Sequence, residues 1–194
     1  MTQPISSAHQ PGQDASQIRA ELRQFLLQQR RSVEPSLRRQ WDQQIAHRLL
    51  AWCRQNAPAS LGVYWPIQAE PDLRDCYQQL SDSGIVLALP LVQKKNTALR
   101  FLAWRPGDPM SVDGYGIPVP EQREQWIQPA ALVIPCVGFN ARRYRLGYGG
   151  GYYDRTLEHE PRPVTVGVAY RCAEADFPAE AHDIAMDVIL TDAA

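Results

Sequence analysis

Lysine is almost missing from this sequence of 194 residues, and its charges nearly cancel. Only Lys94 and Lys95 are lysines, so every other strongly basic side chain is an arginine. Genomic bias alone would explain such usage, but it also means that a phosphate site here has to use forked guanidinium donors. The formal net charge of −1 leaves no overall field that would draw the chain to nucleic acid or to a membrane.

Paired cysteines, a leader and long apolar runs are also lacking. The four cysteines are scattered and form no C-x-x-C pair, which favours a reduced cytoplasmic protein over a disulfide frame or a zinc site. Residues 1–15 have neither a basic start nor an apolar run, so we expect a disordered tail there and a folded domain at 16–194. No stretch approaches the roughly 20 apolar residues that a membrane span needs.

What the sequence does contain is an alternation of helical and strand-like segments. Apolar spacing predicts helices from Ser16 onward and at 35–55, 72–80 and 152–158, and strands at 61–65, 85–89, 99–104, 131–134, 164–170 and 188–191. Short, wholly apolar strands between helices are typical of a largely parallel sheet covered on both faces. We therefore predict a single-domain, three-layer α/β/α fold, in which ligands bind beyond the carboxyl ends of the strands.

The segment after the strand at 131–134 is rich in glycine and arginine. Glycines at 147 and 149–151 allow positive φ and a close approach of the backbone to a ligand, and Arg142, Arg143 and Arg145 precede them. A helix starting at Tyr152 would add free N–H groups, and all these donors suit a phosphate. The plain alternative is a tight turn with solvated arginines. The spacing fits neither G-x-x-x-x-G-K-[ST] nor G-x-G-x-x-G.

The stretch at 135–157, PCVGFNARRYRLGYGGGYYDRTL, resembles a family pattern, P-x-x-A-F-D-x-x-G-x-R-L-G-x-G-G-G-Y-Y-D-R-x-L, of the 5-formyltetrahydrofolate cyclo-ligases. Further segments agree in order: RAELR at 19–23, VYWPIQAE at 63–70, FLAW at 101–104, YGIPVP at 115–120 and HDIAMDVILT at 182–191. The resemblance covers nearly all of the chain after residue 16. Arg19 replaces a usual lysine, Val119 a glutamate, Asn140 an aspartate and Arg143 a glycine, and the last two bear on the path of the loop before the glycines.

The resemblance implies an enzyme that acts on a folate and ATP. Family members convert 5-formyltetrahydrofolate to 5,10-methenyltetrahydrofolate with ATP and Mg²⁺, and release ADP and phosphate. The implied ATP-binding residues are Arg19, Arg23, Arg145, Leu146, Gly147, Tyr148, Gly149, Gly150, Gly151, Tyr152 and Tyr153, with Arg145 and Tyr153 acting in catalysis. The implied folate-binding residues are Trp65, Glu70, Tyr148, Gly149, Gly150, Gly151 and Tyr152, and the implied magnesium ligands are Asp154 and Asp187.

These residue types suit such a reaction. A formyl oxygen is a weak nucleophile, so catalysis depends on aligning it with the γ-phosphate and on neutralising charge with arginines, N–H groups and a hard cation. Glu70 can accept hydrogen bonds from the N–H groups of a pterin, and Trp65 can offer a wall to its ring. Neither a nucleic acid nor a membrane partner is expected.

Simpler explanations exist for the same residues. Arg19 and Arg23 would also suit a solvated helix face, and Glu70 and Asp154 would also suit helix starts. Asp187 fits a turn equally well, and a tryptophan at a strand end is commonly part of a core. At the level of the whole protein, the rivals are an isomerase or transferase of sugar phosphates and an RNA-binding module that uses the arginines at 142–145.

Overall fold

The computed structural model of the protein describes residues 15–193. The tail expected at 1–15 lies outside the described residues except for Ala15, at which α1 (Ala15–Ser32) begins. The chain continues with α2 (Pro35–Asn56), β1 (Ser60–Gly62), α3 (Arg74–Asp82), β2 (Val86–Leu91), β3 (Arg100–Trp104), β4 (Met110–Val112), β5 (Pro118–Pro120), β6 (Trp126–Ile127), β7 (Ala131–Pro135), β8 (Gly138–Phe139), β9 (Arg145–Leu146), α4 (Tyr152–Leu157), β10 (Val164–Val168), the 3₁₀ turn η1 (Arg171–Ala173) and β11 (Val188–Leu190). No helix within 15–193 is long and apolar enough to cross a membrane.

A seven-stranded sheet in the order β11-β10-β7-β1-β2-β3-β6 lies at the centre of the molecule. The strands from β11 to β2 are parallel, and β3 and β6 add an antiparallel edge. Two small hairpins, β4 with β5 and β8 with β9, lie outside this sheet. The largely parallel sheet confirms the predicted α/β fold. Apolar strands of this kind need chain packed against both faces of the sheet.

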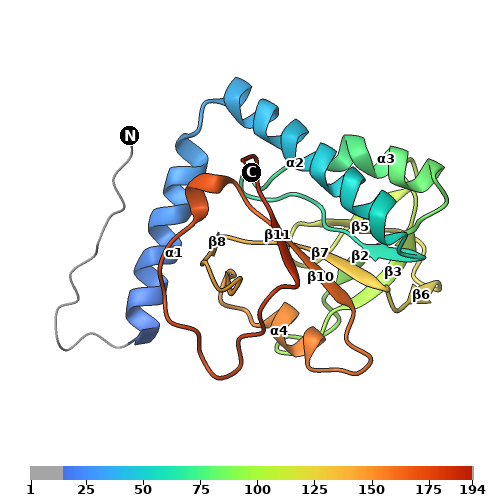
Figure 1. Ribbon diagram of the computed structural model, residues 1–194. Coiled ribbons are helices and arrows are strands. Elements are labelled where there is room, and N and C mark those ends of the chain that lie inside the picture. Colours follow the sequence, from blue (N-terminus) through green and yellow to red (C-terminus); the bar gives the residue numbers. More distant parts are fainter. Residues whose placement is uncertain (1–14, 194) are drawn as a thin grey trace.

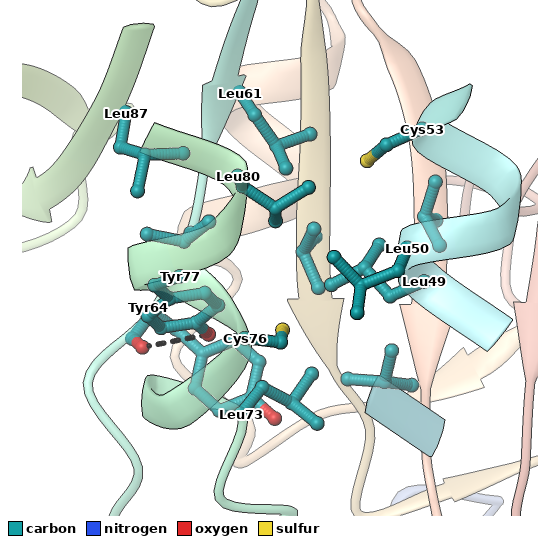
Figure 2. Close-up of a cluster of buried hydrophobic side chains, with 14 of the residues drawn as sticks. Leu49, Leu50, Cys53, Leu61, Tyr64, Leu73, Cys76, Tyr77, Leu80 and Leu87 are labelled. Atoms are coloured by element: carbon teal, nitrogen blue, oxygen red, sulfur yellow. Dashed lines mark hydrogen bonds between the residues drawn. The ribbon is translucent and has the colours of Figure 1, made fainter. Parts of the chain in front are cut away.

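Helices α2 and α3 cover one face of the sheet (Figure 1). Figure 2 shows side chains of α2, such as Leu49, and of α3, such as Leu80, gathered against Leu61 of β1 and Leu87 of β2. Each of these four side chains is buried, and full burial of one leucine stabilises the fold by about 1.5–3 kcal/mol. Helix α2 starts where the Glu34 carboxylate accepts hydrogen bonds from the first free N–H groups of the helix.

The opposite face has thinner cover. Short helix α4 lies there (Figure 1), and its Leu157 packs with Met186 of the chain before β11 against Leu132 of β7. Helices therefore lie on both faces as predicted, although irregular chain supplies part of the second layer. Helix α1 stands beside the sheet, where Leu26 packs against Leu146 of β9.

Five strands end at other residues than the apolar runs predict: β10 ends at 168 instead of 170, β7 and β11 each differ by one residue, and β1 and β2 differ by more than one. Strand β1 stops at Gly62 instead of residue 65, although the N–H of Val63 still donates to the carbonyl of Ala88, and the chain then turns through Gln68 and Ala69 at φ of 48° and 61°. Strand β2 runs on through Pro90, which was expected to end it. The register with β1 ends at residue 88, so Pro90 lies where β2 has only β3 as a neighbour and a missing N–H is tolerated.

Candidate active site

A cleft of about 800 Å³ opens at the edge where the parallel strands end. Trp65 follows β1, Val92 follows β2 and Pro135 ends β7, and all three line the cleft. The predicted site residues that line it are Arg19, Arg23, Trp65, Glu70, Arg145, Gly147, Tyr148, Gly149, Gly150, Gly151, Tyr152, Tyr153 and Asp154. Two predicted site residues do not line the cleft. Leu146 is fully buried in the small core beside α1, and Asp187 is hydrogen-bonded to Thr165 of β10.

The glycine run forms one wall of the cleft and depends on glycine at two positions. Gly149 has φ of 90° and Gly151, the residue before α4, has φ of 63°, a region that side chains disfavour. Arg23 of α1 lies against this wall, and its Nε donates to the carbonyl of Gly147 at 2.6 Å. The predicted helix start at Tyr152 is confirmed, but α4 has only six residues, so the arginines provide most of the positive charge.

Arginines from distant parts of the chain meet beside the glycine wall. Both Nη atoms of Arg19 bond the carboxylate of Asp183, at 2.7 and 3.2 Å, and Arg145 bonds Asp154 at 2.9 Å. Burial and the neighbouring Arg19 lower the pKa of Arg23. A guanidinium still stays charged at neutral pH, so the cluster offers planar donors that suit phosphate oxygens, although Asp183 and Asp154 balance the charges of Arg19 and Arg145.

Glu70 is 3% exposed and lines the part of the cleft that we call the acidic end, as distinct from the arginine end at Arg19, Arg23 and Arg145. Its two oxygens accept hydrogen bonds from the N–H of Ile67 at 2.9 Å and from the hydroxyl of Tyr148 at 2.7 Å. Burial raises the pKa of this carboxyl, and these two hydrogen bonds only partly oppose the rise. A carboxylate has room for about four hydrogen bonds, so Glu70 can accept two more from a ligand.

Aromatic side chains surround the acidic end. Trp65 packs edge-on to Trp104 with 6.2 Å between the rings, and the guanidinium of Arg74 lies 5.1 Å from its ring centre. Elsewhere in the lining of the cleft, the hydroxyl of Tyr115 is 2.8 Å from that of Tyr152, which joins the loop between β4 and β5 to the start of α4, next to the glycine wall. Aromatic walls with a few polar groups are typical of sites for flat organic ligands.

The two predicted magnesium ligands are placed differently. Asp154 lines the cleft beside Arg145. Asp187 instead accepts hydrogen bonds from the N–H and hydroxyl of Thr165, both at 2.8 Å, and bonds Arg162 at 2.6 Å. Within residues 15–193, the group of side chains spaced closely enough to hold an ion is another one, Glu180, His182 and Asp183.

Three residues of the cleft and its support were not among the predicted ones. Asp183 pairs with Arg19, Tyr115 meets Tyr152, and Arg30 bonds the hydroxyl of Tyr148 at 2.6 Å. A signal for Arg30 exists in the sequence, because it follows Arg23 by seven residues and thus lies on the same face of α1. Tyr115 begins the matching segment YGIPVP at 115–120, but only the folded hairpin brings it to Tyr152.

Fold and site together define an α/β protein whose cleft combines a glycine run and arginines with a buried carboxyl and aromatic side chains. Comparisons with known proteins agree. The model of the 5-formyltetrahydrofolate cyclo-ligase family matches residues 15–192. The 5-formyltetrahydrofolate cyclo-ligase of Haemophilus influenzae is 28% identical over 186 residues, which cover 92% of this chain and 97% of that protein.

Solved structures lead to the same family. The 5,10-methenyltetrahydrofolate synthetase of Aquifex aeolicus superposes with a TM-score of 0.79 at 28% identity and covers 91% of each chain. That of Mycoplasma pneumoniae gives 0.75 at 27% identity, over 90% of this chain and 98% of the other. The chain belongs to the 5-formyltetrahydrofolate cyclo-ligase family. Membership confirms the expected class of activity, an ATP-dependent folate ligase of one-carbon metabolism.

Proposed function

We propose that this cleft converts 5-formyltetrahydrofolate to 5,10-methenyltetrahydrofolate, with ATP as the second substrate. One observation carries the assignment of the site: a single cleft is lined both by the glycine run with its arginines and by Glu70 with Trp65. In this reaction the formyl oxygen attacks the γ-phosphorus and ADP leaves. N10 then attacks the formyl carbon and loses its proton, and inorganic phosphate departs with the formyl oxygen.

We assign the phosphates of ATP to the arginine end. Arg19, Arg23 and Arg145 face this end, and the backbone from residue 145 to 153 supplies N–H donors. Leu146 is buried, so it contributes through its backbone and by anchoring the loop. Arg145 and Tyr153 are the proposed catalytic residues, because Arg145 can neutralise charge on the group in transfer and Tyr153 lies against its guanidinium, with 5.5 Å to the ring centre.

We assign the folate to the acidic and aromatic end. Glu70 would accept hydrogen bonds from the pterin N–H groups, and Trp65 would lie against the ring. Tyr148, Gly149, Gly150, Gly151 and Tyr152 also line the cleft and would contact both substrates. This arrangement places the formyl group near the γ-phosphate, and such alignment is the main source of catalysis when the nucleophile is weak.

Of the two predicted magnesium ligands only Asp154 lines the cleft, and it would share its carboxylate between Arg145 and a magnesium ion. Asp154 offers a carboxylate inside the cleft, and hard oxygen ligands are what Mg²⁺ prefers. Asp187 would have to exchange Arg162 for the ion, since its oxygens are bonded to Arg162 and Thr165. When bound, the ion would neutralise negative charge on the phosphates of ATP.

We also propose the cytoplasm as the place of action. All four cysteines are free thiols, and Cys53, Cys76 and Cys136 are buried. Reduced cysteines are typical of the cytoplasm. The proposed ligands are the folate, ATP and Mg²⁺, without a role for nucleic acid.

The test of this function is an absorbance assay for methenyltetrahydrofolate. Purified protein should form it from 5-formyltetrahydrofolate when both ATP and a divalent cation are present. Turnover that persists at the same rate without ATP would refute the mechanism, and turnover that persists after EDTA treatment would refute the role of the ion. Binding of sugar phosphates without use of ATP would favour the rival isomerase or transferase.

A further inference from the structure

Arg30 is a buried arginine without a part in the roles assigned so far. It is 3% exposed and extends from the last turns of α1 toward the acidic end of the cleft. Its Nε donates to the carbonyl of Gln68 at 3.1 Å, one Nη to the carbonyl of Cys136 at 3.4 Å, and the other to the hydroxyl of Tyr148 at 2.6 Å. One planar group therefore contacts three segments that meet around Glu70.

These contacts determine the direction of the hydrogen bond between Tyr148 and Glu70. An arginine can only donate, so the Tyr148 hydroxyl accepts from Arg30. Its single hydrogen is then left for Glu70, whose oxygen lies 2.7 Å away. As long as Arg30 is in place, Tyr148 is a donor to Glu70, and this favours the charged form of the carboxyl.

Arg30 also holds the turn that carries Glu70. Gln68 and Ala69 adopt positive φ of 48° and 61°, a conformation that costs about 1–2 kcal/mol for each residue with a side chain. The turn is closed by Glu70 itself, whose side chain accepts from the N–H of Ile67 and whose N–H donates to the carbonyl of Ile67. The bond from Arg30 to the Gln68 carbonyl fastens this turn to α1.

We infer that Arg30 is a positioning residue for the folate end of the cleft: it holds Tyr148 and the 67–70 turn so that Glu70 faces the ligand as a carboxylate. The inference rests on the proposed role of Glu70 in binding folate. It assigns Arg30 an effect on folate affinity and on its pH dependence, and no direct contact with either substrate.

The charges around Glu70 set the sign of the pH effect. Burial raises the pKa of Glu70, and the Ile67 N–H, the Tyr148 hydroxyl and the positive charge of Arg30 oppose the rise. The other titratable groups that face it, Tyr64, Tyr153 and Cys136, are neutral at physiological pH because burial raises the pKa of each. Loss of Arg30 should therefore raise the pKa of Glu70 and move the acidic fall of folate affinity to higher pH.

The experiment compares Arg30→Met, Arg30→Lys and a matched control, Arg31→Met. Arg31 contacts the same turn through the side chain of Gln68, outside the Tyr148 bridge. Carbon-13 NMR of labelled glutamate carboxyls follows the titration of Glu70, with its signal assigned by Glu70→Gln. Dissociation constants for 5-formyltetrahydrofolate and for ATP are measured separately between pH 5 and 8.

Arg30→Met should raise the titration midpoint of Glu70 by about one unit, the effect expected from loss of a nearby opposite charge. Its folate dissociation constant at neutral pH should rise roughly tenfold while that of ATP changes less than about twofold. Arg31→Met should match the wild type. A wild-type midpoint in Arg30→Met, or equal loss of both ligands, would overturn the inference.

Arg30→Lys covers the case in which the methionine variant does not fold. An ammonium keeps the charge but cannot bond three acceptors from one plane, so the midpoint should stay while folate affinity still falls several-fold. Wild-type folate affinity in this variant would overturn the positioning role. If Glu70→Gln itself binds folate normally, the proposed folate pocket is wrong, and the midpoint in Arg30→Met separately decides whether Arg30 controls Glu70.

Discussion

Opposing effects act on the ionisation of the Glu70 carboxyl. It is buried, which disfavours its charge, yet it accepts two hydrogen bonds and lies near a buried arginine. Replacing it by glutamine keeps the size and removes the charge. We expect Glu70→Gln to weaken folate binding by one to two decades, since a hydrogen bond to a charged group is worth about 1.5–3 kcal/mol.

Separate titrations of Glu70→Gln with folate and with ATP check this expectation. ATP affinity should stay near the wild type, because the arginine end does not depend on this carboxyl. Equal loss of both ligands would instead show that Glu70 mainly holds the turn at 67–70.

The two predicted magnesium ligands call for a paired experiment. Asp154→Asn should cut turnover by about two decades with the fold intact, by analogy with the loss of one preorganised stabiliser of transferred charge, and added Mg²⁺ should partly restore it. Asp187→Asn should also cut turnover and, in addition, lower stability by about 0.5–1 kcal/mol, because its carboxylate is held by Thr165 and Arg162.

Arg162→Gln is the matched control, since it removes the ion pair and keeps the carboxylate. If Asp187→Asn and Arg162→Gln lose stability alike and both keep full turnover, Asp187 is an anchor and no ligand. The pKa of Asp187 is lowered because bonds from Thr165 and Arg162 outweigh its burial. Its stabilising effect should therefore be present at neutral pH and fade below about pH 4, as urea unfolding across pH would show.

At the residue scale, the sequence led to most of the cleft through its resemblance to one family. Glycines, arginines and acids with known spacing can be matched one by one, so Arg19, Glu70 and Asp154 were found. Arg30 was missed because its importance comes from three partners in distant segments. The bonds of Asp187 to Thr165 and Arg162 could not be predicted either, since they depend on how β10 and β11 pair.

At the element scale, the glycine wall can be tested against a glycine elsewhere in the fold. Gly149 and Gly84 share φ of 90°, and a side-chain carbon at either would meet no closer atom than 3.6 Å. Alanine should cost each about 1–2 kcal/mol of stability, or roughly 2–8 °C in Tm. Only Gly149→Ala should also lose turnover, because its wall is the proposed ATP site and touches Arg23.

Calorimetry and the methenyl-folate assay on both variants decide the point. Equal turnover in Gly149→Ala and Gly84→Ala would show that the wall tolerates a side chain. An equal loss of turnover in Gly84→Ala, outside the cleft, would mean that backbone strain alone explains the loss in Gly149→Ala.

Some helices and strands were predicted from the sequence and others were not. Long α2 was found because its apolar residues recur at helical spacing, whereas strands β7 and β10 were found as short, largely apolar runs. The hairpins β4–β5 and β8–β9 were not, since strands of two or three residues have no period to detect. The end of β2 was wrongly predicted at Pro90, because a proline ends a strand only where its missing N–H would have bonded a neighbouring strand.

At the scale of the whole molecule, the cleft joins α1, the segment after β1, the glycine wall and the chain before β11. A ligand that binds all of these should stabilise the folded state as a unit. At about 100 times its Kd, ATP with Mg²⁺ should add about 2.7 kcal/mol and raise Tm by roughly 5–10 °C. Thermal scans check this, and Asp154→Asn should show a smaller rise; an unchanged Tm would argue against binding in this cleft.

The bond between Arg19 and Asp183 joins residues 164 positions apart. Closing a loop of that length costs conformational entropy before the contact forms. Contacts between residues so far apart in sequence therefore slow folding. During synthesis, Arg19 and Arg23 are made long before the segment that carries Asp183. A nascent chain therefore has its glycine wall before Arg19 has its partner, and we expect the cleft around Arg19 to be complete only after Asp183 has been made.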